Sequence, residues 1–101
     1  MAIGRVSKDA NAVEPFQIDW SKYLPAGFNI ATSTWTIEGF DDGAMTLPFD
    51  KVLAGNITKV WVKDGTPGKQ YKIVNRIVTD VDADAQKVTD DESIVIYVTQ
   101  R

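Results

Sequence analysis

Carboxylates are the only abundant side chains in this chain that could do acid–base chemistry. The 101 residues include no histidine and no cysteine, so the commonest general base, the imidazole metal ligand and the thiolate metal site are all missing. Asp41 and Asp42 are adjacent carboxylates, the residue type that glycosidases use in pairs. They stand directly before Gly43, however, which is typical of a solvated turn. We therefore expect no catalytic residue and no enzymatic activity.

A second group of acids follows a calcium-like spacing. Alternate aspartates can direct oxygens at one hard cation, but the sixth position from Asp80 is Ala85 instead of the glycine that the sharp turn of a calcium loop needs. No flanking helices are predicted either. We expect a charged hairpin loop without a metal or cofactor, and calcium binding stays the alternative. The acids are Asp80, Asp82, Asp84, Asp90, Asp91 and Glu92.

Three tryptophans could stack against sugar rings. Trp20, Trp35 and Trp61 would need two indoles exposed side by side to form such a platform. In a domain this small, tryptophan more often belongs to the core. We expect core positions, above all for Trp35, and keep a carbohydrate-binding or cell-surface module as the alternative function.

The elements that position these residues are predicted to be strands. Turn signals recur at short intervals, and the runs between them are rich in valine, isoleucine, threonine and aromatic residues, as in a sandwich or barrel. No stretch has a helical stripe, so no crossover helix for a parallel sheet is expected. The turn signals lie at residues 24–27, 41–43, 54–56 and 64–68.

The second half of the chain shows the clearest alternation. In Gln70–Thr79 the odd-numbered residues, from Tyr71 to Thr79, form the more apolar face and are expected to be buried. Residues 93–100 place Ile94, Ile96 and Val98 on one side, as in an inner strand whose second face is partly covered. For residues 57–63, Trp61 opposes Val60 and Val62, and the alternation leaves the inward face open.

The first half is less regular. Phe16 and Ile18 share a parity with Trp20 in a strand that opens after Pro15, and residues 20–24 are expected to form a short helical turn. The apolar parity changes between residues 28–30 and 35–37, so we expect a bulge or bend between residues 31 and 34. A short strand carries Met45, Leu47 and Phe49.

Together these patterns predict an all-β fold, an antiparallel two-sheet sandwich of about seven strands. Tyr71 lies near the start of the penultimate strand, two residues before the inward Ile73, where immunoglobulin-like sandwiches place a tyrosine corner. We expect its hydroxyl to bond to nearby backbone. The predicted division is an N-terminal arm over residues 1–12 and an immunoglobulin-like β-sandwich domain over residues 13–101. The arm could order on a neighbouring subunit or simply fray.

Charge and composition exclude several partners. Lysine and arginine number 11, aspartate and glutamate 14, and the net charge is −3. The basic residues are dispersed, so no basic stripe for nucleic acid is expected. No apolar run approaches the roughly 20 residues of a membrane span, and the first residues lack the pattern of a signal peptide. We expect synthesis in the cytoplasm, without nucleic-acid or membrane binding.

A resemblance adds a function to this fold. The chain resembles small structural proteins of tailed bacteriophages with an immunoglobulin-like fold, the fiber-tail adaptor family, at residues 18–21, 23–31 and 33–35 and again at residues 60–65, 68, 71–79 and 93–96. The resemblance implies a non-enzymatic virion component in the tail or head-to-tail region. Its implied partners are other virion structural proteins and further copies of itself in an oligomeric assembly, and no substrate or cofactor follows.

Overall fold

Seven strands and one short 3-10 helix make up the chain in a computed structural model that describes residues 2–81 and 85–100. No helix in these two ranges is long and apolar enough to cross a membrane. The elements are β1 (Ala2–Asp9), β2 (Val13–Asp19), η1 (Trp20–Lys22), β3 (Ile30–Glu38), β4 (Met45–Leu53), β5 (Ile57–Asp64), β6 (Gln70–Thr79) and β7 (Thr89–Thr99).

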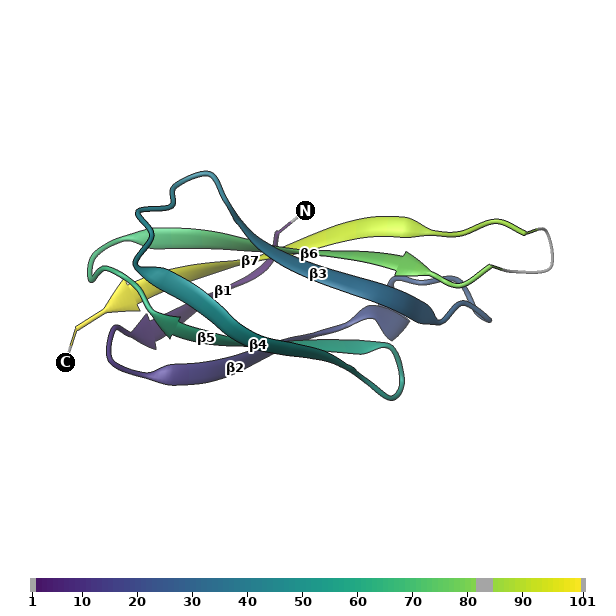
Figure 1. Ribbon diagram of the computed structural model, residues 1–101, viewed down its shortest axis with the longest axis horizontal. Coiled ribbons are helices and arrows are strands. Elements are labelled where there is room, and N and C mark those ends of the chain that lie inside the picture. Colours follow the sequence, from purple (N-terminus) through teal and green to yellow (C-terminus); the bar gives the residue numbers. More distant parts are fainter. Residues whose placement is uncertain (1, 82–84, 101) are drawn as a thin grey trace.

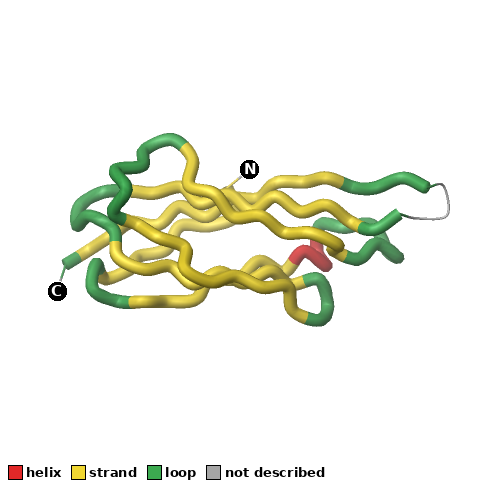
Figure 2. The backbone as a smooth tube through the Cα atoms, in the orientation of Figure 1, coloured by secondary structure: helices red, strands yellow, loops and turns green. Residues whose placement is uncertain are grey.

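The strands form two sheets, a four-stranded sheet in the order β1-β7-β6-β3 and a three-stranded sheet in the order β2-β5-β4. Figure 1 shows the two sheets as layers along the long axis of the molecule, and Figure 2 shows how little of it is helical. The predicted all-β sandwich is confirmed. The orders β2-β5-β4 and β7-β6-β3 agree with the B-E-D and G-F-C orders of immunoglobulin-like sandwiches.

One strand pair differs from the expected antiparallel arrangement. β1 runs parallel to β7, with Arg5 opposite Val95 and Ser7 opposite Tyr97. The segment expected to be part of an arm is therefore an edge strand of the larger sheet. Its pairing partner lies at the other end of the sequence, and nothing local to residues 2–9 indicates that partner. An ordering of residues 1–12 on a neighbouring subunit stays a prediction.

β6 and β7 supply most of the inner face of the larger sheet. β6 has the predicted bounds, and its odd-numbered residues are all buried. β7 is an inner strand as predicted, buries Ile94, Ile96 and Val98, and begins at Thr89 instead of residue 93. Strict alternation against one core explains why these two strands could be placed from sequence.

The irregularities of the first half also lie near their predicted places. The register of β3 against β6 shifts between Ile30 and Thr32, at the first residue of the predicted interval. η1 forms within the predicted helical turn, because the Asp19 side chain accepts a hydrogen bond from the Ser21 backbone N–H at 3.1 Å.

The core lies between the sheets and receives side chains from both. In β5 the even-numbered residues point inward, which resolves the face that alternation left open. The buried apolar cluster comprises Ile18, Trp20, Met45, Val60, Val62, Tyr71, Ile73, Ile77, Ile94, Ile96 and Val98.

Candidate docking surfaces

Of the adjacent carboxylates Asp41 and Asp42, Asp42 has a structural role. Asp42 Oδ1 accepts a hydrogen bond from the Tyr71 hydroxyl at 2.8 Å, and its Oδ2 accepts one from the Thr66 hydroxyl at 2.5 Å. The Tyr71 hydroxyl accepts from the Thr66 backbone N–H at 2.8 Å, so the predicted bond to nearby backbone is confirmed. The hydrogen bonds from Thr66 and Tyr71 lower the pKa of Asp42. Asp42 is thus an ionised anchor that fixes its loop to the start of β6.

The loop that Asp42 anchors presents an aromatic residue and a second carboxylate to solvent. Phe40 is 48% exposed, and its ring lies 5.4 Å from the Tyr71 ring, centroid to centroid. Lys69 Nζ lies 5.8 Å from the Phe40 ring centroid. Asp41 is exposed and accepts a hydrogen bond only from the Gly43 backbone N–H among the bonds of the described residues. We call Phe40, Asp41 and Asp42 the acidic loop.

The outer face of the three-stranded sheet carries an aromatic row. Pro15 of β2 pairs with Trp61 of β5, which pairs in turn with Phe49 of β4. Phe49 is 53% exposed and Trp61 is half-buried. Lysines border this row, and we call the whole surface the lysine–aromatic face: Pro15, Phe49, Lys51, Lys59, Trp61 and Lys63.

The charges of the lysine–aromatic face are unbalanced within the chain. Lys51 lies directly opposite Lys59 across the β4–β5 pair, an arrangement that destabilises a sheet. Lys59 Nζ lies 5.3 Å from the Trp61 ring centroid, a cation–π contact. The ion pair found among the described residues joins Arg76 and Asp91 on the other sheet and involves none of these lysines. The face is therefore a positive, partly apolar surface on an acidic protein.

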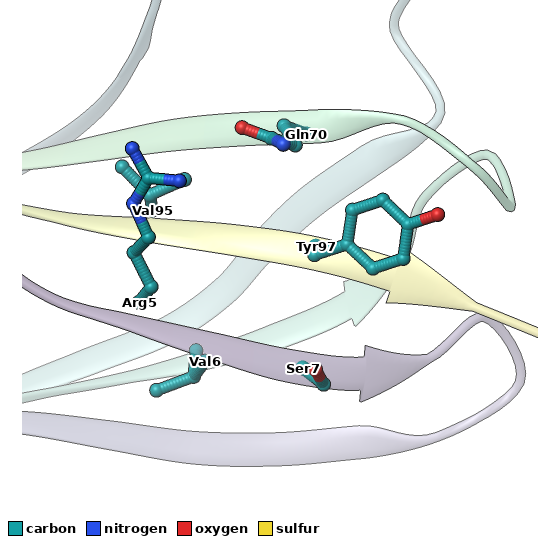
Figure 3. Close-up of a pocket in the computed structure, with 6 residues that line it drawn as sticks. All are labelled: Arg5, Val6, Ser7, Gln70, Val95 and Tyr97. Atoms are coloured by element: carbon teal, nitrogen blue, oxygen red, sulfur yellow. The ribbon is translucent and has the colours of Figure 1, made fainter.

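The outer face of the four-stranded sheet has two shallow grooves. The first has a volume of about 320 Å³, and Figure 3 shows Arg5 of β1 reaching past Val95 towards Gln70, with Tyr97 beside it. The second, of about 370 Å³, contains Arg76 and Asp91. Arg76 Nε and Nη2 donate to the two carboxylate oxygens of Asp91 at 2.8 and 2.9 Å, and this contact lowers the pKa of Asp91. These open polar surfaces are suited to contacts with another protein rather than to enclosing a substrate.

The three tryptophans do not form a platform. Trp20 is fully buried, and Trp35 is half-buried and packs against the core. A core position was expected above all for Trp35, yet Trp20 is the more deeply buried of the two. Its indole N–H finds polar partners inside the sandwich: Asn75 Oδ1 at 2.9 Å and Thr58 Oγ1 at 3.1 Å. Trp61 alone lies on the lysine–aromatic face, so no two indoles are exposed side by side.

The acidic segment after β6 is only partly described. Asp82 and Asp84 lie outside the described residues, so the expectation of a loop without a metal, and the alternative of calcium binding, stay untested there. Asp80 Oδ1 accepts a hydrogen bond from the Asn29 backbone N–H at 3.2 Å, and Asp91 is paired with Arg76. Within residues 2–81 and 85–100, no three acidic side chains are grouped as a metal site.

The burial of two ionisable residues, Lys8 and Glu92, was not predicted from the sequence. Lys8 is 1% exposed, its Nζ donates to the backbone carbonyls of Asp9 and Asp64, both at 2.8 Å, and burial lowers its pKa. Glu92 is 4% exposed, its Oε2 has no hydrogen-bond partner among the described residues, and burial raises its pKa. Parity was the available signal, since Glu92 alternates in phase with Ile94 and Ile96.

Comparisons with known proteins give one family. The family model described as "Podophage GP4 fiber-tail adaptor protein gp77" matches residues 8–97. No curated protein matches the chain. Among solved structures, the chain is similar to the cysteine protease inhibitor EhICP2 from Entamoeba histolytica, with a TM-score of 0.46 and 16% sequence identity over 93% of this chain and 85% of that one. A likeness this distant has no bearing on function.

Proposed function

Because the chain belongs to the podophage GP4 fiber-tail adaptor protein family, we propose that it is a non-enzymatic structural protein of a phage virion, an adaptor in the tail or head-to-tail region. The observation that carries the proposal is the extent of the family match, which begins within β1 and ends within β7. It therefore spans both sheets of the immunoglobulin-like sandwich, rather than one motif that unrelated sandwiches could share.

The surfaces of the molecule support a role in protein–protein contact. The sandwich has a positive aromatic face on one sheet, open polar grooves on the other, and a hydrogen-bonded loop that presents Phe40. Exposed aromatic side chains on a rigid scaffold are typical anchors of protein interfaces. In our proposal the partners are other virion structural proteins and further copies of this chain, assembled in the host cytoplasm.

Mass spectrometry of purified particles tests this proposal. Particles from a lysed culture that carries the gene would be banded on a density gradient, and peptides of this chain would be counted against those of the major capsid protein. We expect a constant ratio of a few copies per particle across the band. An abundant host protein in the same fractions serves as the measure of contamination. Absence of the chain from particles, with abundant protein in the lysate, would overturn the proposal.

A further inference from the structure

Among the described residues, no lysine of the lysine–aromatic face forms an ion pair. Lys51 and Lys59 repel each other across the β4–β5 pair, and Lys63 continues the positive surface along β5. The aromatic row between them leaves Phe49 more than half exposed. A surface with these features is complemented by an acidic group placed next to an apolar side chain.

The acidic loop of the same chain has that chemistry. Phe40 is a large apolar side chain, and Asp41 and Asp42 follow it directly. The hydrogen bonds from Thr66 and Tyr71 keep Asp42 ionised and hold the loop in one conformation. A loop that is fixed before binding loses little conformational entropy when it docks, which favours affinity.

The acidic loop does not cover the lysine–aromatic face of its own chain. Phe40 packs against Tyr71 at the start of β6. Figure 1 shows the β3–β4 connection rising away from the layer that β2, β4 and β5 form. Phe40 and Phe49 each keep about half of their side-chain surface exposed in the single chain. Two different surfaces of one molecule are thus uncovered, complementary in charge and both aromatic.

We propose that copies of this chain associate head to tail, with the acidic loop of one copy docked on the lysine–aromatic face of the next. A contact between two different surfaces is heterologous, so repeating it produces a ring if the rotation closes and a filament if it does not. The place of this assembly in a particle rests on the proposed adaptor function, whereas the contact itself is a property of the purified chain. Ring closure adds avidity, so each single contact can be weak.

Sedimentation velocity on the purified chain tests the contact. Between about 10 µM and about 1 mM, a range that covers weak contacts, we expect association that grows with concentration and falls as salt screens the charges. Lys59→Glu and Asp41→Lys should each weaken association at least about tenfold, as expected for close interfacial charge pairs. Phe40→Ala should weaken it as well, without changing its salt dependence.

Mixing the two charge-reversed variants gives the sharper test. In an equimolar mixture, the reversed loop of Asp41→Lys faces the reversed surface of Lys59→Glu, and each variant also offers its unchanged surface to the other. Association should therefore be stronger in the mixture than in either variant alone. The matched control is Lys87→Glu, which makes the same charge change at an exposed site outside both surfaces.

Structural damage can be separated from a lost contact. Lys59→Glu removes the like-charge pair with Lys51, so its melting temperature should not fall below that of the unchanged chain. A chain that stays monomeric up to about 1 mM at low salt, a mixture that stays dissociated, or a Lys87→Glu variant as weak as Lys59→Glu would overturn the contact. Such results would leave the particle mass spectrometry unaffected, so failure of the contact and failure of the adaptor function can be told apart.

Discussion

At the scale of single residues, one polar cluster inside the sandwich joins the two sheets. Trp20 follows β2, Thr58 lies in β5, and both bond to Asn75 of β6. Asn75 Nδ2 donates to Ser33 Oγ at 2.8 Å and to the Thr34 carbonyl at 3.2 Å, which brings β3 into the same cluster. A buried polar group that is fully hydrogen-bonded can be tolerated in a core, and removal of one partner leaves the others unsatisfied.

Trp20→Phe should therefore destabilise the fold strongly. The variant loses the indole N–H that serves Asn75 and Thr58 and leaves a small cavity, so we expect the free energy of unfolding to fall by about 2–3 kcal/mol. Urea denaturation followed by circular dichroism measures it. Trp61→Phe on the outer face is the control and should change stability by less than about 0.5 kcal/mol. Equal losses in the two variants would contradict a structural role for the cluster.

Glu92 should make stability fall as the pH rises. Burial raises its pKa in the folded state, so the folded chain binds the proton more tightly than the unfolded chain, and stability is lost as the pH rises from the ordinary glutamate pKa towards the raised one. Glu92→Gln cannot ionise and should be more stable than the unchanged chain at pH 8 by about 1 kcal/mol. Near pH 4 the two melting temperatures should converge. A pH-independent gain for Glu92→Gln would contradict the argument.

At the scale of the elements, the β5–β6 connection depends on a glycine that packs closely. Gly65 has φ +109°, and a Cβ placed there would lie 2.8 Å from Val98 Cγ2 and 3.3 Å from Met45 Cε. Gly68 in the same connection has φ +84° but open space around it. Gly65→Ala should cost about 2–3 kcal/mol, through both backbone strain and the clash, and Gly68→Ala about 1 kcal/mol through strain alone. Calorimetry on both variants separates the two effects, and equal losses would show that the close approach is unimportant.

The strands differ in how much of their structure the sequence could predict. β6 was predicted to the residue because one of its faces alternates strictly against the core. The inward face of β5 could not be predicted, because valines lie on one face and a tryptophan on the other. Its pairing with β2 and β4 in the three-stranded sheet places Trp61 on the outer face. The lysine–aromatic face was hidden for the same reason, since Pro15, Phe49 and Trp61 are distant in sequence and meet through register alone.

β1 escaped prediction for a different physical reason. Lys8 interrupts the apolar parity that a buried strand would show, and the strand that β1 pairs with lies at the far end of the chain. An inward-pointing charge on an edge strand is a known way to discourage further strand pairing. Local alternation therefore could not reveal a strand whose stability depends on a distant partner and on two backbone carbonyls.

At the scale of the whole molecule, removing β1 tests whether this strand is an integral part of the sandwich or a dispensable arm. It covers the outer edge of β7, and Lys8 ties it to the Asp64 carbonyl of β5 in the other sheet. A chain that begins at residue 10 should lose more than about 3 kcal/mol of unfolding free energy and should aggregate through the uncovered β7 edge. Urea denaturation and light scattering would measure the two effects. Lys8→Met keeps the strand and removes only the buried amine. This control separates the contribution of strand pairing to the unfolding free energy from that of the buried charge. If the shortened chain instead keeps full stability, residues 1–9 are separable from the sandwich and free to order on a neighbouring subunit.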